Sequence, residues 1–310
     1  MDNLKLLQYC IDHPEKFLDY NYMFVKKDTN LKTHRERTIE IKELLTAIKK
    51  IRKKKNAESV EVQLFEELQE RLKKYANYSE FGCFINACDS NINESINDID
   101  LLKKITHLYL EKRDLCDITP TEWIQAIIDK GASRKKGQAG ENKLIKILEK
   151  NKFIRVKKIK DFNENDKCMA KFSRSGDFSN EDIKNNFGIF IGKKTQGKKL
   201  DLIIKKSKNI YFLEAKHLNT SGGEQNKQVL ELIEIIKEKP SGDLHFVSFL
   251  DGIHSNNILN FANGKKNKSE KTKEEMQNND IKKNLTKNKN NYWINTAGFI
   301  KLFAVNIEKN

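Results

Sequence analysis

The sequence predicts an α/β protein with a helical N-terminal region, and three features of the chain support this prediction. Apolar residues recur at helical spacing through much of the first 130 residues. Two short apolar runs rich in strand-forming residues follow one another between residues 200 and 217. A third run, LHFVSFLDG, is typical of a buried strand. We therefore expect a helical region over residues 1–130 and an α/β core over residues 131–310.

Two amphipathic patterns and a set of boundary signals predict the helices of the N-terminal region. Apolar residues fall mainly at helical spacing in TIEIKELLTAIKKIRKKK and again in SVEVQLFEELQERLKKYA. In TPTEWIQAIIDKG, Thr119 is a candidate cap, Pro120 suits the first turn and Gly131 ends the helix. Residues 86–100 are polar, so we expect a loop or short linker there.

The core is predicted to begin near Ser133 with a helix, SRKKGQAGENKLIKILEKNKF, whose apolar residues Leu144, Ile147 and Leu148 fall at helical spacing. Two strands are expected next, FIRVKKI and FGIFIG, the second ending at Gly192. The intervening residues 161–186 are polar and are predicted to be irregular.

The C-terminal part of the core continues with alternating helices and strands. A helix is predicted over GEQNKQVLELIEIIKEK, followed by the strand LHFVSFLDG. The chain closes with YWINTAGFIKLFAVNI, which predicts a strand and then a helix, with Tyr292 and Trp293 in the core.

The candidate site lies in GKKLDLIIKKSKNIYFLEAKH, which predicts a hairpin of two strands. Such a hairpin brings Asp201 beside Glu214 and Lys216, which lie two residues apart and so share one face of their strand. Mg²⁺ prefers carboxylate oxygens, here Asp201 and Glu214, and the Ala215 carbonyl offers a third ligand. We expect Lys216 to orient a water or hold a phosphate, with a pKa that burial can lower.

Asp201 within LDLII and Glu214-Ala215-Lys216 on the next strand resemble the PD-(D/E)xK nuclease motif, with Leu200 in place of the proline of its name. The resemblance implies a mixed central sheet flanked by helices, Mg²⁺ as cofactor, and a preceding helix whose acidic residue joins the site. Glu141 matches that acidic residue, and a carboxylate favoured by the helix dipole is the equally supported alternative. Asp177, within SRSGDF, is a less favoured metal ligand because its surroundings show no strand pattern.

The order of motifs over residues 130–310 is similar to that of MboI/DpnII-type restriction endonucleases, and the step Ser221-Gly222-Gly223 is its most specific element. The resemblance implies a type II restriction endonuclease that cuts double-stranded DNA at a specific site and leaves 5′-phosphates. It further implies a homodimer, a palindromic site of GATC type, and a cognate DNA methyltransferase without a stable complex. Residues 1–130, which match no motif, would then serve DNA recognition or dimerisation.

Several polar residues near the hairpin are candidates for contacts with DNA. Gln225 and Gln228 lie at the start of a predicted helix, where backbone donors suit a phosphate. Lys198, Lys199 and Ser221 flank the two strands and complete this set. His217 alternates to the opposite face of its strand, so we expect it to be structural.

The formal net charge of +15 and the pI near 9.3 fit a nucleic-acid partner. Residues 262–291 hold nine lysines and four acids, which predicts either a flexible arm that orders on DNA or a solvated surface insertion. The cationic run of residues 49–55 likewise suits phosphates or a solvated helix end.

Composition narrows the class of protein further. We expect no membrane segment and no signal peptide, and the five cysteines show no metal-binding spacing, so a cytoplasmic protein with reduced thiols is predicted. Two alternatives remain open: a repair or structure-specific nuclease of the same fold, and a DNA-binding protein without catalysis. Paired carboxylates facing a polyanion argue against the second, because they repel phosphate unless a metal lies between them.

Overall fold

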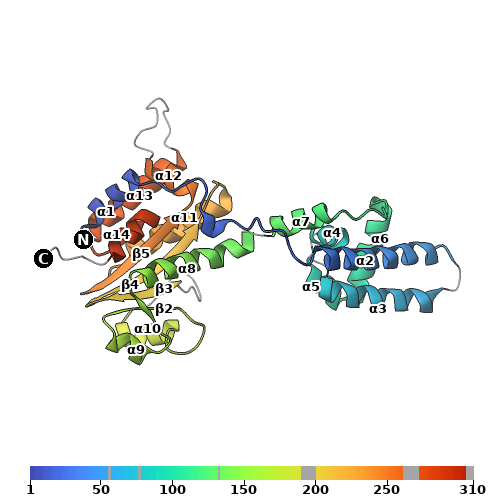
Figure 1. The fold of residues 1–310 in the computed structure, drawn as a ribbon, viewed down its shortest axis with the longest axis horizontal. Helices are drawn as coiled ribbons and strands as arrows, with labels where there is room; N and C mark the ends of the chain where they lie inside the picture. Colours follow the sequence, from blue (N-terminus) through green and yellow to red (C-terminus); the bar gives the residue numbers. More distant parts are fainter. Residues whose placement is uncertain are drawn as a thin grey trace. The chain divides into compact units, whose positions relative to one another are not determined.

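A six-stranded mixed sheet, with its strands in chain order, lies at the centre of the α/β part of the protein (Figure 1). The computed structural model describes residues 1–54, 57–75, 78–88, 90–131, 133–189, 200–260 and 272–304. The strands are β1 (Ile154–Arg155), β2 (Lys167–Lys171), β3 (Leu202–Lys206), β4 (Asn209–His217), β5 (Leu244–Asp251) and β6 (Tyr292–Ile294). β3 pairs antiparallel with β2 and β4, whereas the β1–β2, β4–β5 and β5–β6 pairs are parallel.

The chain divides into two units, and the α/β unit takes both ends of the sequence. It comprises Met1–Met23 and Arg134–Asn310, and the other unit comprises Phe24–Ser133. The sequence pattern assigned residues 1–23 to the helical region, whereas in the structure they belong to the α/β unit. Helix α1 (Asn3–Asp12) buries Leu6 and Leu7 in the core of the α/β unit, which explains this assignment.

Helices cover both faces of the sheet. On one face, α14 (Thr296–Phe303) packs Phe299 against Phe249 of β5, and α8 (Ser133–Lys150) places Lys143 over the same ring. On the other face lies α11 (Gly223–Lys237), whose Leu232 carbonyl accepts a hydrogen bond from Ser248 of β5. The remaining helices of this unit are η1 (Tyr20–Tyr22), α9 (Ile159–Glu164), α10 (Asn180–Phe187), α12 (Ile253–Leu259) and α13 (Lys273–Lys287).

The second unit is helical, as the sequence predicts for this region. A separate apolar cluster holds it together, to which the long helices α2 (Leu31–Ile51) and α3 (Glu58–Tyr75) contribute Leu45, Ile48, Phe65 and Leu68. Helix α7 (Thr121–Lys130) ends before Gly131, as predicted, but Pro120 is its N-cap and makes no side-chain cap hydrogen bond, so the predicted cap at Thr119 and the predicted place of Pro120 in the first turn are wrong. The helices are α2 (Leu31–Ile51), α3 (Glu58–Tyr75), α4 (Glu80–Asn86), α5 (Ile92–Asn97), α6 (Ile99–Lys112) and α7 (Thr121–Lys130).

Polar segments that were predicted to be irregular contain regular structure. Residues 161–186 include β2 and most of α10, and residues 86–100 include α5. Asn91 caps α5 and Ser179 caps α10, each accepting a hydrogen bond from a backbone N–H, so short polar side chains stabilise these helices locally. The predicted strand FIRVKKI is reduced to the two residues of β1, and Phe187 of FGIFIG ends α10, while residues 190–192 lie outside the described residues.

The basic segment 262–291 also departs from prediction over its described part. Residues 273–287 form α13, which buries Ile281 and Leu285 in the core of the α/β unit. Two apolar side chains one turn apart therefore anchor a helix whose other positions are mostly polar. Residues 261–271 lie outside the described residues.

Candidate functional site

The β3–β4 hairpin is local in sequence and positions the predicted carboxylates. Lys206 pairs with Asn209, so Ser207 and Lys208 form a two-residue turn, and Ser207 adopts the positive φ of 55° that such turns require. Leu202, Ile203 and Ile204 of β3 are fully buried, which fixes the register of the pair. The residue before β3, Asp201, is thereby placed at the end of the hairpin distant from the turn.

A direct hydrogen bond joins Asp201 to the Glu-Ala-Lys segment of β4. The Ala215 N–H donates to Asp201 Oδ2 at 2.7 Å, and the Asp201 N–H donates to the Leu213 carbonyl at 2.9 Å. In a strand the N–H and C=O of one residue point to the same side, so the Ala215 carbonyl also faces Asp201. Asp201 and Ala215, two of the predicted metal ligands, are therefore adjacent in the structure.

Glu214 and Lys216 share the α11 face of the sheet, as the alternation of side chains along β4 requires. The ammonium group of Lys216 lies 2.8 Å from Glu214 Oε1 and 3.9 Å from Glu231 Oε2 of α11. Glu214 is only 3% exposed, whereas a quarter of the Lys216 side chain remains accessible. The lysine thus reaches from a buried carboxylate toward solvent.

Burial and charge shift the protonation of this group of residues. Burial and the Glu214 carboxylate raise the pKa of Asp201 to about 7, against the opposing effects of the Ala215 hydrogen bond and Lys216. Burial disfavours the Lys216 ammonium, but the Glu214 and Asp201 carboxylates outweigh it and raise the pKa of Lys216. Burial therefore does act to lower the pKa of Lys216, as considered from the sequence, but the neighbouring carboxylates reverse the direction and favour the ammonium form.

Glu141 approaches the hairpin from α8. Its Oε2 accepts from the Lys171 ammonium at 2.6 Å, and its charge contributes to the raised pKa of Asp201. Lys171 is on β2, opposite Leu202, so the ion pair lies next to the strand that follows Asp201. The structure therefore brings Glu141 near the carboxylate pair and ties it to a lysine. Asp177 instead accepts a hydrogen bond from the Ile159 N–H at the start of α9.

The donor set suits a hard divalent cation with few protein ligands. Among the described residues no group of three His, Cys, Asp or Glu side chains has metal-binding geometry. Asp201 and Glu214 with the Ala215 carbonyl provide only oxygen donors, and Mg²⁺ is commonly held by one or two carboxylates with several waters. A cation would also relieve the repulsion that raises the pKa of Asp201, so the residues fit Mg²⁺.

The structure describes three of the five residues that were predicted to contact DNA. Gln225 and Gln228 lie one turn apart in the first half of α11, and Gln228 is three residues before Glu231, which faces Lys216. Gln225 folds back toward Gly222, where a Cβ atom would lie 2.5 Å from its Oε1. Ser221 is exposed directly before this helix. Lys198 and Lys199 lie outside the described residues.

A second cluster of charged and aromatic side chains lies on the α8 face of the sheet. This cluster was not predicted from the sequence. Asp251 Oδ2 accepts from the Lys143 ammonium at 2.8 Å and from the Tyr22 hydroxyl at 2.7 Å. Asp251 Oδ1 lies 2.8 Å from His217 Nδ1, and the His217 ring stacks on Tyr22 with centroids 3.6 Å apart. His217 thus has the structural contacts expected of it.

Sequence signals for this cluster exist, although they are indirect. A Cβ atom on Gly140 would lie 3.1 Å from the Tyr22 hydroxyl, so the absence of a side chain at Gly140 leaves room for the tyrosine. Gly252 follows Asp251 in the chain and has a positive φ of 85°, which favours glycine. A Cβ atom at this position would lie only 2.3 Å from the Leu218 carbonyl oxygen. Neither glycine identifies its partner, because Tyr22, Gly140 and Asp251 are far apart in the chain.

Comparisons with models of known protein families, with curated proteins and with solved structures return no match to this chain. Within the described ranges, every helix is too short or too polar to span a bilayer. The five cysteines are free thiols, and Cys10 and Cys168 are buried.

Proposed function

We propose that the protein is a Mg²⁺-dependent endonuclease of the PD-(D/E)xK type that hydrolyses phosphodiester bonds of double-stranded DNA. The observation that carries the proposal is the hydrogen bond from the Ala215 N–H to Asp201, which unites Asp201 with the Glu214–Lys216 segment. Two carboxylates, one backbone carbonyl and one accessible ammonium then share one end of a hairpin. This combination of groups supports phosphodiester hydrolysis better than binding alone.

The residues divide the chemistry between them. Asp201, Glu214 and the Ala215 carbonyl would hold Mg²⁺, which when bound lowers the pKa of a coordinated water and neutralises phosphate charge. Lys216 remains protonated because two carboxylates raise its pKa, so it positions the phosphate or a water instead of accepting a proton. Its ion pair with Glu214 fixes where that positive charge lies.

The distribution of charge supports DNA as the substrate. Residues 24–133 carry 20 Lys and Arg against 19 Asp and Glu, so nearly all of the net charge of +15 belongs to the α/β unit that holds the site. Site-specific cleavage, a homodimer that cuts both strands of a palindrome, and a cognate methyltransferase extend the proposal to a type II restriction enzyme. A cytoplasmic location and reduced thiols belong to the same proposal.

The direct test is incubation of the purified protein with unmethylated plasmid and phage DNA, in Mg²⁺ and in EDTA. Discrete fragments that require Mg²⁺ support a site-specific endonuclease, and sequencing their ends gives the site and the position of the phosphates. A smear or nicked circles would favour a repair or structure-specific nuclease. Binding without cleavage on any duplex, RNA or branched substrate would reject the enzymatic proposal.

Asp201→Ala is the variant that tests the assignment of residues. We expect cleavage to fall by roughly three orders of magnitude, because a metal ligand is removed. Binding of DNA in EDTA should persist or improve, because one carboxylate no longer repels phosphate. Asp177→Ala is the matched control and should cleave normally, since the hydrogen bond of Asp177 in the described part of the chain is to the Ile159 N–H at the start of α9. Normal cleavage by Asp201→Ala would place the site elsewhere.

A further inference from the structure

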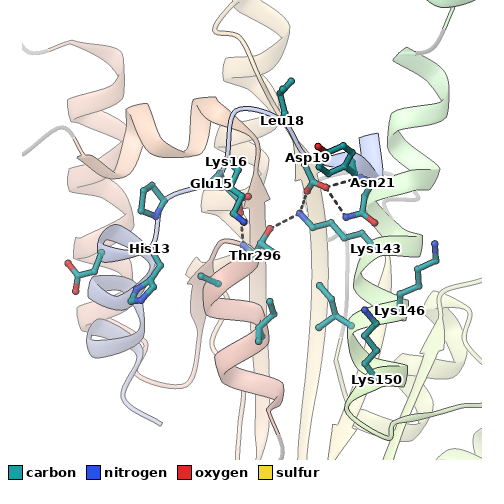
Figure 2. A pocket seen from close by; sticks show the side chains of 16 residues that line it. His13, Glu15, Lys16, Leu18, Asp19, Asn21, Lys143, Lys146, Lys150 and Thr296 are labelled. Carbon is teal, nitrogen blue, oxygen red and sulfur yellow. Dashed lines mark hydrogen bonds and ion pairs between the residues drawn. The ribbon is translucent and has the colours of Figure 1, made fainter. Parts of the chain in front are cut away.

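A pocket of about 770 Å³ lies between α8 and α14, beneath the segment formed by residues 13–21 (Figure 2). Its volume is within the range of roughly 300–1,000 Å³ typical of small-molecule sites. Ile147 from α8 and Ala297 and Ile300 from α14 supply apolar walls, and Leu18 and Tyr20 come from the covering segment. The pocket belongs to the α/β unit and is distinct from the carboxylate site.

Hydrogen bonds and an ion pair within the protein hold the covering segment in place. Asn256 exchanges two hydrogen bonds with the backbone of Glu15, at 2.8 and 2.9 Å. Glu15 Oε1 accepts from the Thr296 N–H at 2.6 Å, and Asp19 forms an ion pair with Lys143 at 2.7 Å (Figure 2). A pocket with a fixed cover costs little ordering entropy when a ligand binds.

The positive charges of the pocket fall into two classes. Lys143 is 4% exposed, and its three donors are satisfied by Asp19, Asp251 and Thr296. Lys16, Lys146 and Lys150 also line the pocket, and none of them has an ion pair or hydrogen bond with any described residue. Lys146 and Lys150 are four residues apart on α8 and therefore neighbours on its surface. The carboxylates that also line the pocket have partners within the protein, since Asp12 accepts from Gln8, Glu15 from Thr296 and Asp19 from Lys143, so the three unpaired ammonium groups favour an anion.

Two further features indicate an aromatic ligand body. Tyr20 is 84% exposed, although large aromatic side chains are usually at least partly covered. Glu15 Oε1 accepts from the Thr296 N–H, which leaves Glu15 Oε2 to accept a hydrogen bond from an amino group of a ligand. A base can stack on an aromatic ring while cationic groups hold the phosphates, as in proteins that bind single-stranded nucleic acids.

We propose that this pocket binds a nucleotide, with its phosphate groups on Lys146 and Lys150 and its base along the apolar wall beside Tyr20. The nucleotide is either free or part of a single strand, since the recognition chemistry is the same. The inference does not rest on the nuclease proposal, because it uses none of Asp201, Glu214 or Lys216.

Calorimetric titration of the full-length protein in EDTA tests this inference. ATP, GTP and a single-stranded oligonucleotide serve as probes, and tripolyphosphate measures the contribution of charge alone. We expect a nucleotide or the oligonucleotide to bind, and to bind more tightly than tripolyphosphate. Binding of free nucleotides identifies a small effector, whereas binding of the oligonucleotide alone identifies an unpaired strand. No binding of either, or equal binding of tripolyphosphate, would overturn the proposal.

Variants distinguish the pocket from non-specific attraction. Lys146→Gln/Lys150→Gln should weaken binding about tenfold or more, since two ammonium groups no longer face the phosphates. Lys282→Gln/Lys283→Gln on α13 removes the same charge from exposed positions outside the pocket and should leave binding within about twofold. Equal weakening in both variants would overturn the proposal. Asp201→Ala should bind nucleotide normally, so failure of this site and failure of the nuclease proposal give separate results.

Discussion

Asp201 shows how strongly the surroundings of one residue depend on the fold. In sequence it is an ordinary aspartate before an apolar run, but burial and the Glu214 carboxylate raise its pKa to about 7. In the metal-free protein the folded state therefore keeps a proton between about pH 4 and 7 that the unfolded chain releases. Because the unfolded state binds fewer protons in this range, stability falls as pH rises from 4 to 7.

Asp201→Asn removes this titration and should stabilise the metal-free protein. We expect its free energy of unfolding to match that of the wild type near pH 4 and to exceed it by about 1–3 kcal/mol at pH 8. Denaturant unfolding in EDTA across this range measures the difference. Added Mg²⁺ should stabilise the wild type and not the variant. A difference that does not change with pH would contradict the raised pKa.

Asp251 is the second residue whose role depends on its neighbours. It is fully buried and accepts from Lys143, Tyr22 and His217, so its charge balances a lysine that is 4% exposed. We expect Asp251→Asn to lower the free energy of unfolding by about 3 kcal/mol, because Lys143 keeps its charge with one carboxylate fewer. Adding Lys143→Met should recover part of this loss. A double variant that is less stable than Asp251→Asn would contradict the argument.

At the scale of elements, helix α2 combines a buried face with a basic face. Ile41, Leu45 and Ile48 are buried in the helical unit. Lys49, Lys50 and Lys53 border a hollow of about 250 Å³ and have no ion pair with any described residue. In a unit whose charges nearly cancel, this face is a local concentration of positive charge suited to phosphates.

Replacing Lys49, Lys50 and Lys53, at and just beyond the end of α2, by glutamine should weaken DNA binding most at low salt. The slope of log K against log salt concentration should fall in magnitude by about 0.9 for each phosphate that the protein no longer neutralises. Binding measured in EDTA at several salt concentrations gives this slope. Lys32→Gln/Lys104→Gln/Lys130→Gln removes the same charge from exposed positions of the same unit. Equal changes in both triple variants would indicate that only net charge matters.

At the scale of the whole molecule, the α/β unit is assembled from both ends of the chain. Asn3 on α1 donates to the carbonyls of Leu285 and Asn291, near the other end of the sequence. Leu6 and Leu7 lie in the same core as β3 and β4. The helical unit is thus inserted in the sequence between Met23 and Arg134 of the α/β unit.

Leu6→Ala should therefore destabilise the unit that holds the carboxylate site. We expect a loss of about 2–5 kcal/mol, the usual cost of removing a buried leucine side chain. Hydrogen exchange followed by mass spectrometry should show faster exchange in β3, β4 and α14. Leu45→Ala, buried in the helical unit, should accelerate exchange in α2 and α3 instead. Faster exchange of β3 and β4 in Leu45→Ala alone would reject this division.

The sequence by itself determined the elements whose signals are local. The β3–β4 hairpin, α11, β5 and α7 follow from apolar periodicity and boundary residues, and side-chain alternation places Glu214 and Lys216 on one face. Asp201 could be expected beside Glu214 and Lys216 because the hairpin that joins them spans only a few residues. Short polar helices such as α5 and α10 were missed because caps stabilise them where periodicity is weak.

Only the tertiary structure decided the contacts between distant segments. Tyr22, Lys143 and Asp251 meet through packing of α8, β5 and the first residues of the chain, and no spacing in the sequence records that meeting. The same holds for α1 in the α/β core and for the pocket between α8 and α14. Protonation depends on this packing as well, because desolvation and charge act through space and set the pKa of Asp201 and Lys216.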